Sequence, residues 1–234
     1  MTPDARLGRF LGVAFLAQFV TSLAAGALSL PILTGDISPV MVGINNNVDQ
    51  MRAAIVLDLA TCVGIIVMTA LLYVVLRGQS RIVALVALVL WLAEAMLTAV
   101  SVLALYALLP LSAEFVKAGA PPTSYYETLG VAFLGIEQHA YDLTLLFFCL
   151  GAFLWYGLFF RSRIVPRALA AWGLLAMPLV LAGTLVAVWD RGLNVSFAIY
   201  LPYLPFELVT GLWLLVRGTR STSTAGAEDC GVGD

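Results

Sequence analysis

Four carboxylic acids and the only histidine of this chain lie inside or at the edge of long apolar stretches: Asp58, Glu94, Asp142, Glu207 and His139. These stretches are long enough to cross a bilayer, which takes about 20 helical residues. An ionisable side chain at membrane depth costs about 2.5 kcal/mol or more, so it usually faces the interior of a helix bundle or a cavity. The five residues therefore form a candidate site, in which Glu94, Asp58, His139 and Glu207 are the candidate catalytic residues.

Such a site suits acid–base chemistry on a lipophilic molecule. A carboxyl kept neutral by burial can donate a proton, which is the role expected of Glu94. Asp58 or Glu207 would then stabilise positive charge on the substrate, and Trp91 would offer a π face. In a transporter, Asp58, Glu94 and His139 would relay protons instead. A single histidine without HxxxH or HExxH spacing disfavours a metal, so neither metal nor cofactor is expected.

Other side chains fall on the same helical faces as these acids. Trp91 precedes Glu94 by three residues and Thr98 follows it by four, spacings that share one face of a helix. Tyr203 lies one turn before Glu207 in the same way. The candidate substrate-binding residues are Asp142, Trp91, Gln18, Thr98, Tyr203 and Arg52.

A purely structural role is the competing interpretation of this polar set. Polar side chains between membrane helices often form only hydrogen-bond links, worth about 0.6 kcal/mol each on average. A protonated Glu94 bonded to Gln18 would need no substrate. Arg52 would anchor its helix at the outer membrane interface, or pair with Glu207 or Asp142 across helices. Four carboxyl groups are more than packing requires, so the sequence favours a shared site.

The composition is that of a polytopic α-helical membrane protein. The sequence is 62% hydrophobic and only 11% charged, with a mean hydropathy of +0.99, whereas soluble domains carry about 25% charged residues. A soluble fold cannot hide this much apolar surface. The net charge of -2 argues against nucleic acid as a partner. The expected partners are membrane lipids and a lipophilic ligand, and the oligomeric state stays open.

Apolar run lengths predict an all-α bundle of six transmembrane helices over residues 1–218, followed by a flexible cytoplasmic tail at 219–234. The predicted spans are Leu7–Leu33, Arg52–Leu76, Ile82–Leu109, Tyr141–Phe160, Ala168–Trp189 and Tyr200–Val216. Nine of the 12 basic residues precede the first span or follow the second, fourth and sixth spans. Because cytoplasmic loops are enriched in Lys and Arg, both termini are expected in the cytoplasm.

With this topology the ionisable residues lie toward the outer side of the membrane. At 1.5 Å per residue, Asp58 and Glu207 lie about 9 Å and about 10 Å below the outer ends of their helices, and Glu94 lies near the middle. His139 and Asp142, three residues apart, lie at the outer mouth of the fourth span and can touch. The sequence therefore predicts an outward-opening polar wedge.

Two outer loops are expected, and the second runs from Pro110 to about Glu137. Its segment Leu129–Ile136 is apolar but too short to span a membrane alone, so it either lies in the outer interface or extends the fourth helix outward. Five aromatic residues near span ends are typical of an interfacial belt: Trp155, Tyr156, Trp172, Trp189 and Trp213.

A last set of features consists of short segments spread over nearly the whole chain: Val56–Leu59, Trp91–Ala95, His139–Tyr141 leading into Phe147–Phe148, Arg161–Ser162 with Pro166–Arg167, and Glu207 followed by Gly211–Gly218. In order and spacing they resemble the bacterial membrane family called domain-of-unknown-function 4386. Two positions depart from the family pattern, since Trp91 stands in place of an arginine and Asp142 in place of a glycine.

The resemblance implies a bacterial inner-membrane protein with six helices, and it implies no activity. The recurrent acidic and histidine positions of the family match Asp58, Glu94, His139 and Glu207, which favours a shared site over incidental packing.

Three functions remain for the wedge. The leading interpretation is a small intramembrane binding protein or enzyme for a lipophilic molecule, such as an isoprenoid or acyl lipid. A proton-coupled small-molecule transporter is the second, although duplicated halves or paired broken helices, which would favour it, are not evident. A non-catalytic membrane partner or sensor subunit is the third.

Overall fold

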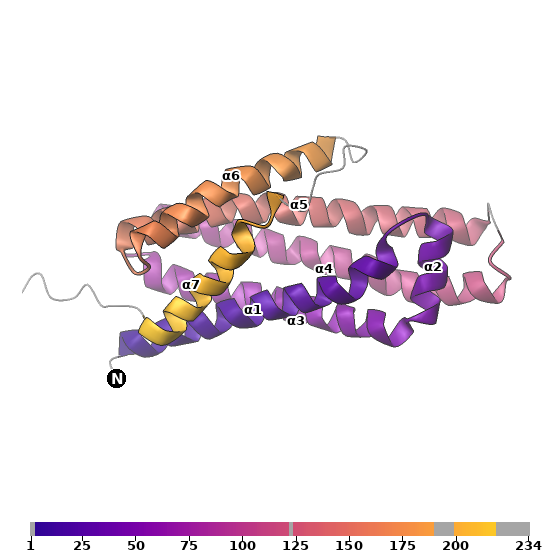
Figure 1. The fold of residues 1–234 in the computed structure, drawn as a ribbon, viewed down its shortest axis with the longest axis horizontal. Coiled ribbons are helices and arrows are strands. Elements are labelled where there is room, and N and C mark those ends of the chain that lie inside the picture. Colours follow the sequence, from indigo (N-terminus) through magenta and orange to yellow (C-terminus); the bar gives the residue numbers. More distant parts are fainter. Residues whose placement is uncertain (1–2, 122–123, 190–198, 219–234) are drawn as a thin grey trace, which may run out of the picture.

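The computed structural model describes residues 3–121, 124–189 and 199–218, which fold into seven α-helices (Figure 1). The predicted all-α class is confirmed, and the predicted tail at 219–234 lies outside the described residues. The helices are α1 (Pro3–Leu33), α2 (Ile37–Asn46), α3 (Val48–Leu76), α4 (Arg81–Lys117), α5 (Tyr125–Ser162), α6 (Arg167–Trp189) and α7 (Tyr203–Arg217).

Five helices of the described chain, α1, α3, α4, α5 and α6, are long and apolar enough to cross a membrane. The chain is therefore a multi-pass membrane protein. The sixth predicted span, Tyr200–Val216, corresponds to α7, which begins at Tyr203 and has only 15 residues. At 1.5 Å per residue α7 is about 22 Å long, shorter than a hydrocarbon core of about 30 Å. A sixth crossing therefore stays a prediction.

Helix lengths differ most from the prediction at the end of the bundle opposite the N-terminus, which is called the outer end after the predicted topology. The fourth predicted span starts at Tyr141, whereas α5 starts at Tyr125, so the segment Leu129–Ile136 extends that helix outward, as one of the two alternatives predicted. Helix α4 likewise continues through Pro110 to Lys117. The length of an apolar run indicates only the part of a helix that lies in lipid. The helix itself can be longer, because its backbone hydrogen bonds continue through flanking polar residues. The α4–α5 hairpin consequently projects furthest from the bundle (Figure 1).

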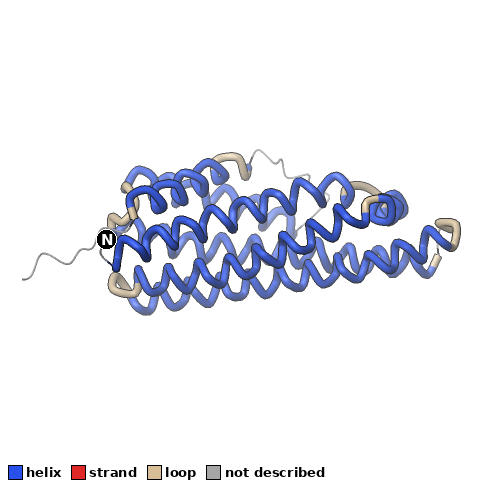
Figure 2. Tube along the Cα trace, turned by 90° about the horizontal axis from the view of Figure 1, so that it is seen from below, coloured by secondary structure: helices blue, strands red, loops and turns tan. Residues whose placement is uncertain are grey.

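The first predicted outer loop contains a helix that the sequence interpretation missed. Helix α2 runs across the bundle axis at its outer end and is seen almost end-on in Figure 2. It buries Val40, Met41 and Ile44 against the bundle, and Met41 fills the space left by Gly130 of α5, whose added Cβ would lie 2.6 Å from Sδ. The sequence interpretation missed this helix because it took turn-forming residues such as Pro39 as evidence of a loop. Proline is nevertheless tolerated in the first turn of a helix.

The long helices form a ring in which each packs on its neighbours in the order α1, α3, α4, α5, α6, α7 and back to α1. The α1–α7 contact closes this ring. At Gly12 of α1 an added Cβ would lie only 2.4 Å from the backbone nitrogen of Leu215, and at Gly211 of α7 it would lie 2.9 Å from Leu16 Cδ2. Small residues allow this close approach of two backbones.

The interfacial-belt interpretation is wrong for two of its five aromatic residues. Trp155 and Tyr156 of α5 are 0% exposed and lie in the core, whereas Trp189 is 90% exposed. Glycines make the room for the buried rings: an added Cβ at Gly173 of α6 would lie 2.9 Å from Tyr156 Cδ2. Position near a span end therefore does not distinguish a ring facing lipid from one facing the bundle.

Ring closure at Gly12 yields a stability prediction. Gly12→Ala should destabilise the protein by about 1–3 kcal/mol, because the new methyl group meets backbone that cannot move aside. Gly26→Ala on the same helix is the matched control, since the nearest atom there, Leu30 Cδ1, is 3.9 Å from the added Cβ. The control should stabilise the protein by about 0.5–1 kcal/mol. Thermal unfolding in detergent measures both, and equal melting temperatures for the two variants would contradict the close approach.

Candidate functional site

Glu94 of α4 and Glu207 of α7 are the central pair of the site. They are 5% and 6% exposed, and their carboxyl groups are within electrostatic range of each other. In the described structure α4 and α7 do not pack against each other, so the two side chains influence each other through the interior of the ring. Two carboxyls so placed cannot both be ionised cheaply, because burial and mutual repulsion both disfavour the second charge.

Asp58 and Gln18 extend this pair toward α3 and α1. The half-buried Asp58 is within electrostatic range of Cys62 on the same helix, and Cys62 in turn is within range of Glu94. Gln18 is 8% exposed and packs on Gly64 of α3, where an added Cβ would lie 3.2 Å from Gln18 Cβ. Side chains from α1, α3, α4 and α7 therefore converge on the ring interior.

Aromatic rings form one wall beside the carboxyl pair. Tyr203, one turn before Glu207, lies between Glu207 and Tyr156 and interacts with both. Phe148 packs edge-on against Tyr203 with ring centres 5.1 Å apart, and it stacks on Trp91 at 6.1 Å. The wall is thus continuous from α4 through α5 to α7.

Trp91 is anchored within that wall. Its Nε1 donates a hydrogen bond to the backbone oxygen of Phe148 at 3.1 Å, and the side chain is 1% exposed. The indole fills the space left by Gly151, where an added Cβ would lie 2.4 Å from Trp91 Cδ1. If Trp91 contacts a substrate, its ring would therefore do so as a rigid surface held in one orientation.

Other predicted site residues lie apart from the pair. His139 is exposed on the outside of α5, while Asp142, three residues on, is buried. The exposed Arg52 forms its ion pair with Asp49 of its own helix at 3.5 Å, so pairing with Glu207 or Asp142 is wrong. Thr98 donates to the backbone oxygen of Glu94 at 3.0 Å. Three-residue spacing leaves two side chains about 60° apart around a helix, so the edge of the buried face of α5 falls between His139 and Asp142.

The described ranges hold no group of three or more His, Cys, Asp or Glu side chains arranged to bind a metal ion. The ring interior instead offers carboxyl, amide and hydroxyl groups.

Several buried polar atoms of the described chain lack a hydrogen-bond partner, and most belong to residues outside the predicted set. Besides Gln18 Oε1 and Glu94 Oε2, they include Thr69 Oγ1 and Thr210 Oγ1. A buried polar group left unpaired costs about 1–3 kcal/mol. Water or a ligand would satisfy such atoms, so Gln18 Oε1 and Glu94 Oε2 are candidate contacts for a bound molecule.

The threonines among them differ from the other threonines of the helices. Thr184, for example, donates to the backbone oxygen of Val180 at 2.9 Å, the usual local bond of a helical threonine, whereas Thr69 and Thr210 do not. Thr210 lies three residues beyond Glu207, toward the end of the bundle that holds the N-terminus (Figure 1). Polar groups thus continue past the carboxyl pair, and the outward wedge describes only part of the site. The sequence signal that could have identified Thr210 is its position three residues after Glu207.

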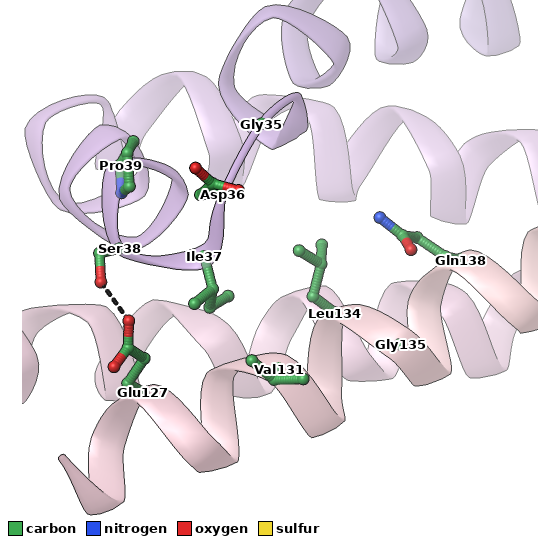
Figure 3. Close-up of a pocket in the computed structure, with 10 residues that line it drawn as sticks. All are labelled: Gly35, Asp36, Ile37, Ser38, Pro39, Glu127, Val131, Leu134, Gly135 and Gln138. Carbon is green, nitrogen blue, oxygen red and sulfur yellow. Dashed lines mark hydrogen bonds between the residues drawn. The ribbon is translucent and has the colours of Figure 1, made fainter. Parts of the chain in front are cut away.

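Two grooves lie near the outer end of the bundle. The larger, about 740 Å³, lies between α2 and α5 (Figure 3), where Ser38 donates a hydrogen bond to Glu127. The smaller, about 410 Å³, lies between α3 and α4 and includes Arg52 and Tyr106. Neither groove is lined by Glu94 or Glu207, both of which are buried.

The sequence matches the family model described as Domain of unknown function (DUF4386) over residues 10–218. The chain belongs to this family. The match includes the carboxyl pair and both outer grooves, so all of them are parts of the DUF4386 domain. The predicted resemblance is confirmed. No curated protein matches this DUF4386 chain, and no solved structure matches it either.

The buried pair yields a prediction that separates a functional carboxyl from a structural one. Glu94→Gln should raise stability at neutral pH by about 1 kcal/mol, because it removes one of two buried carboxyls that disfavour each other. Glu114→Gln on the same helix is the control, since Glu114 is exposed and pairs only with Lys117, at 3.6 Å; it should change little. Thermal unfolding in detergent measures both. A marked loss of stability in Glu94→Gln would show that this carboxyl is a structural link.

Proposed function

We propose that this DUF4386 protein binds a small lipophilic molecule inside its helix ring and exchanges a proton with it through Glu94 and Glu207. The observation that carries the proposal is that these two carboxyls are both buried and lie within electrostatic range of each other. Ionisable groups at membrane depth usually serve binding or proton transfer, because their burial is costly.

The ligand chemistry follows from the groups around the pair. Gln18 Oε1 and Glu94 Oε2 lack a hydrogen-bond donor, so a suitable ligand carries a donor such as a hydroxyl or an amine. The wall of Trp91, Phe148 and Tyr203 suits an apolar or cationic body. An isoprenoid or acyl lipid with a small polar head meets both requirements.

Acid–base chemistry at this site would divide the roles between the acids. Glu94, the more enclosed member of the set, would hold the transferable proton, and Glu207 and Asp58 would stabilise positive charge on the ligand. Tyr203 interacts with Glu207 and would orient it. His139, exposed on the outer surface of α5, would not take part in proton transfer inside the ring.

Proton-coupled transport is the second candidate, and one observation favours it. The unpartnered hydroxyls of Thr69 and Thr210 continue the polar interior beyond the carboxyl pair. A transporter needs polar groups on both sides of its central site so that protons reach it from either face. The same carboxyl pair would then be the proton-binding site.

We also propose that the protein lies in a bacterial inner membrane with both termini in the cytoplasm. The support is a concentration of arginines at one end of the bundle, where α1 starts, α3 and α5 end, and α4 and α6 start (Figure 1). At this end Arg217 lies over Trp213 at 5.1 Å and Arg167 over Phe160 at 5.7 Å. Such pairs suit a membrane interface with a positive cytoplasmic side.

The orientation is testable with the cysteines of the chain itself. Cys62 and Cys149 are buried, and Cys230 belongs to the C-terminal segment. A membrane-impermeant maleimide should label Cys230 in inside-out vesicles and leave it unlabelled in intact spheroplasts. Cys230→Ser should abolish the signal. Labelling in intact spheroplasts would place the C-terminus outside and refute the topology.

Ligand binding is testable by native mass spectrometry with lipidomics on purified protein. A lipophilic molecule should co-purify with the wild type and with Glu114→Gln, and its occupancy should fall about tenfold or more in Glu94→Gln, a change of about 1.4 kcal/mol. Equal occupancy in Glu94→Gln would exclude the carboxyl pair as the binding site. A wild type free of any bound species would favour the non-catalytic partner or sensor subunit.

A further inference from the structure

The end of the bundle that holds the N-terminus carries a group of arginines without carboxylate partners (Figure 1). Seven arginines there form no ion pair with a carboxylate of the described residues: Arg6, Arg77, Arg81, Arg161, Arg163, Arg167 and Arg217. The ion pairs of Arg52 and Lys117 lie at the outer end instead. Guanidinium groups in this state are available to bind an anion from outside the chain.

Three of these arginines lie within seven consecutive residues, from the last turn of α5 to the start of α6. Ser162 fixes the turn between the helices, because its hydroxyl donates to the backbone oxygen of Phe159 at 3.3 Å and accepts from the backbone nitrogen of Ile164 at 3.4 Å. Val165 anchors the turn in the core. The arginines of the turn are exposed: Arg161, Arg163 and Arg167. An ordered turn therefore presents three guanidinium groups from one short segment.

Arg163 occupies a backbone position that favours glycine. It ends α5 in the left-handed conformation, with φ of 56°. Helices that end in this conformation usually place glycine there, because a Cβ strains it. Residues held in strained backbone conformations are concentrated at functional sites. An arginine at this position therefore indicates that its guanidinium group has a use that a glycine would not serve.

Apolar side chains beside the turn place it at the boundary between lipid and water. Arg167 lies over the ring of Phe160 at 5.7 Å, and Phe160 is itself exposed. Helix α6 then presents an exposed apolar stripe of Trp172, Leu175 and Leu179, whose spacing keeps them on one face. A molecule bound here can place an anionic group on the arginines and hydrocarbon chains on α6.

We propose that the α5–α6 turn binds the phosphate group of an anionic phospholipid, whose acyl chains lie along the exposed stripe of α6. Arginine suits this role, because its planar guanidinium group forms two parallel hydrogen bonds with a phosphate. A zwitterionic phospholipid binds less well, since its ammonium group offsets the phosphate charge that attracts arginine. The apolar stripe favours a lipid over a soluble phosphate. This site is separate from the carboxyl pair and does not depend on the ligand proposed there.

Arg163→Gly separates lipid binding from folding. Glycine adopts a positive φ without strain, so this variant should melt no lower than the wild type. Its affinity for phosphatidylglycerol should nevertheless fall about fivefold, the effect expected of one arginine near an anionic headgroup. Arg52→Gln is the control, since Arg52 is an exposed arginine at the outer end and pairs with Asp49; it should leave the affinity unchanged. Arg161→Gln, in the last turn of α5, is the second variant where Arg163→Gly does not fold.

Native mass spectrometry of the full chain in detergent, titrated with dioleoylphosphatidylglycerol, measures the dissociation constant of the first bound lipid. Dioleoylphosphatidylcholine, which has the same chains, should bind more weakly and should bind Arg163→Gly as it binds the wild type. Equal affinity of the wild type for both lipids overturns the anionic ligand. A folded turn variant that keeps its affinity for phosphatidylglycerol, or an equal loss in Arg52→Gln, overturns the turn as the site. Displacement of the lipid by excess glycerol phosphate overturns a lipid as the ligand.

Discussion

A carboxyl group inside a membrane has no water to hydrogen-bond with, so it must lie among other protein groups. The rest of this structure depends on how that constraint is met for Glu94 and Glu207. They come within electrostatic range of each other because α7 packs back on α1 and closes the helix ring. Closure in turn requires Gly12, where the backbone of Leu215 leaves room for a hydrogen alone. The contact that completes the fold therefore also delivers the second carboxyl of the site.

Packing around the pair divides the interior into a rigid part and a polar part. Aromatic rings fit into glycine positions, as Trp91 does at Gly151 and Phe206 at Gly173, and this fixes the wall. Nearby, Glu94 and Thr210 keep polar atoms without partners. A close-packed wall beside unsatisfied polar groups is the arrangement expected where stability is given up for binding.

The two ends of the bundle differ in both shape and charge. The inner end carries the arginines and the starts and ends of the long helices. The outer end carries α2, the projecting α4–α5 hairpin and the acidic groove.

The sequence by itself determined the membrane class, five of the six predicted spans and which acids lie within apolar sequence, because apolar run length and the cost of burying charge are local properties. It did not determine where helices end, since α5 continues in polar sequence back to Tyr125. The sequence also did not determine which helices pack against each other. Helical periodicity shows which side chains share a face of one helix, but not which face of another helix they contact. Only the ring brings Glu94 to Glu207 and leaves His139 outside, because contacts between distant helices depend on how all the helices pack together.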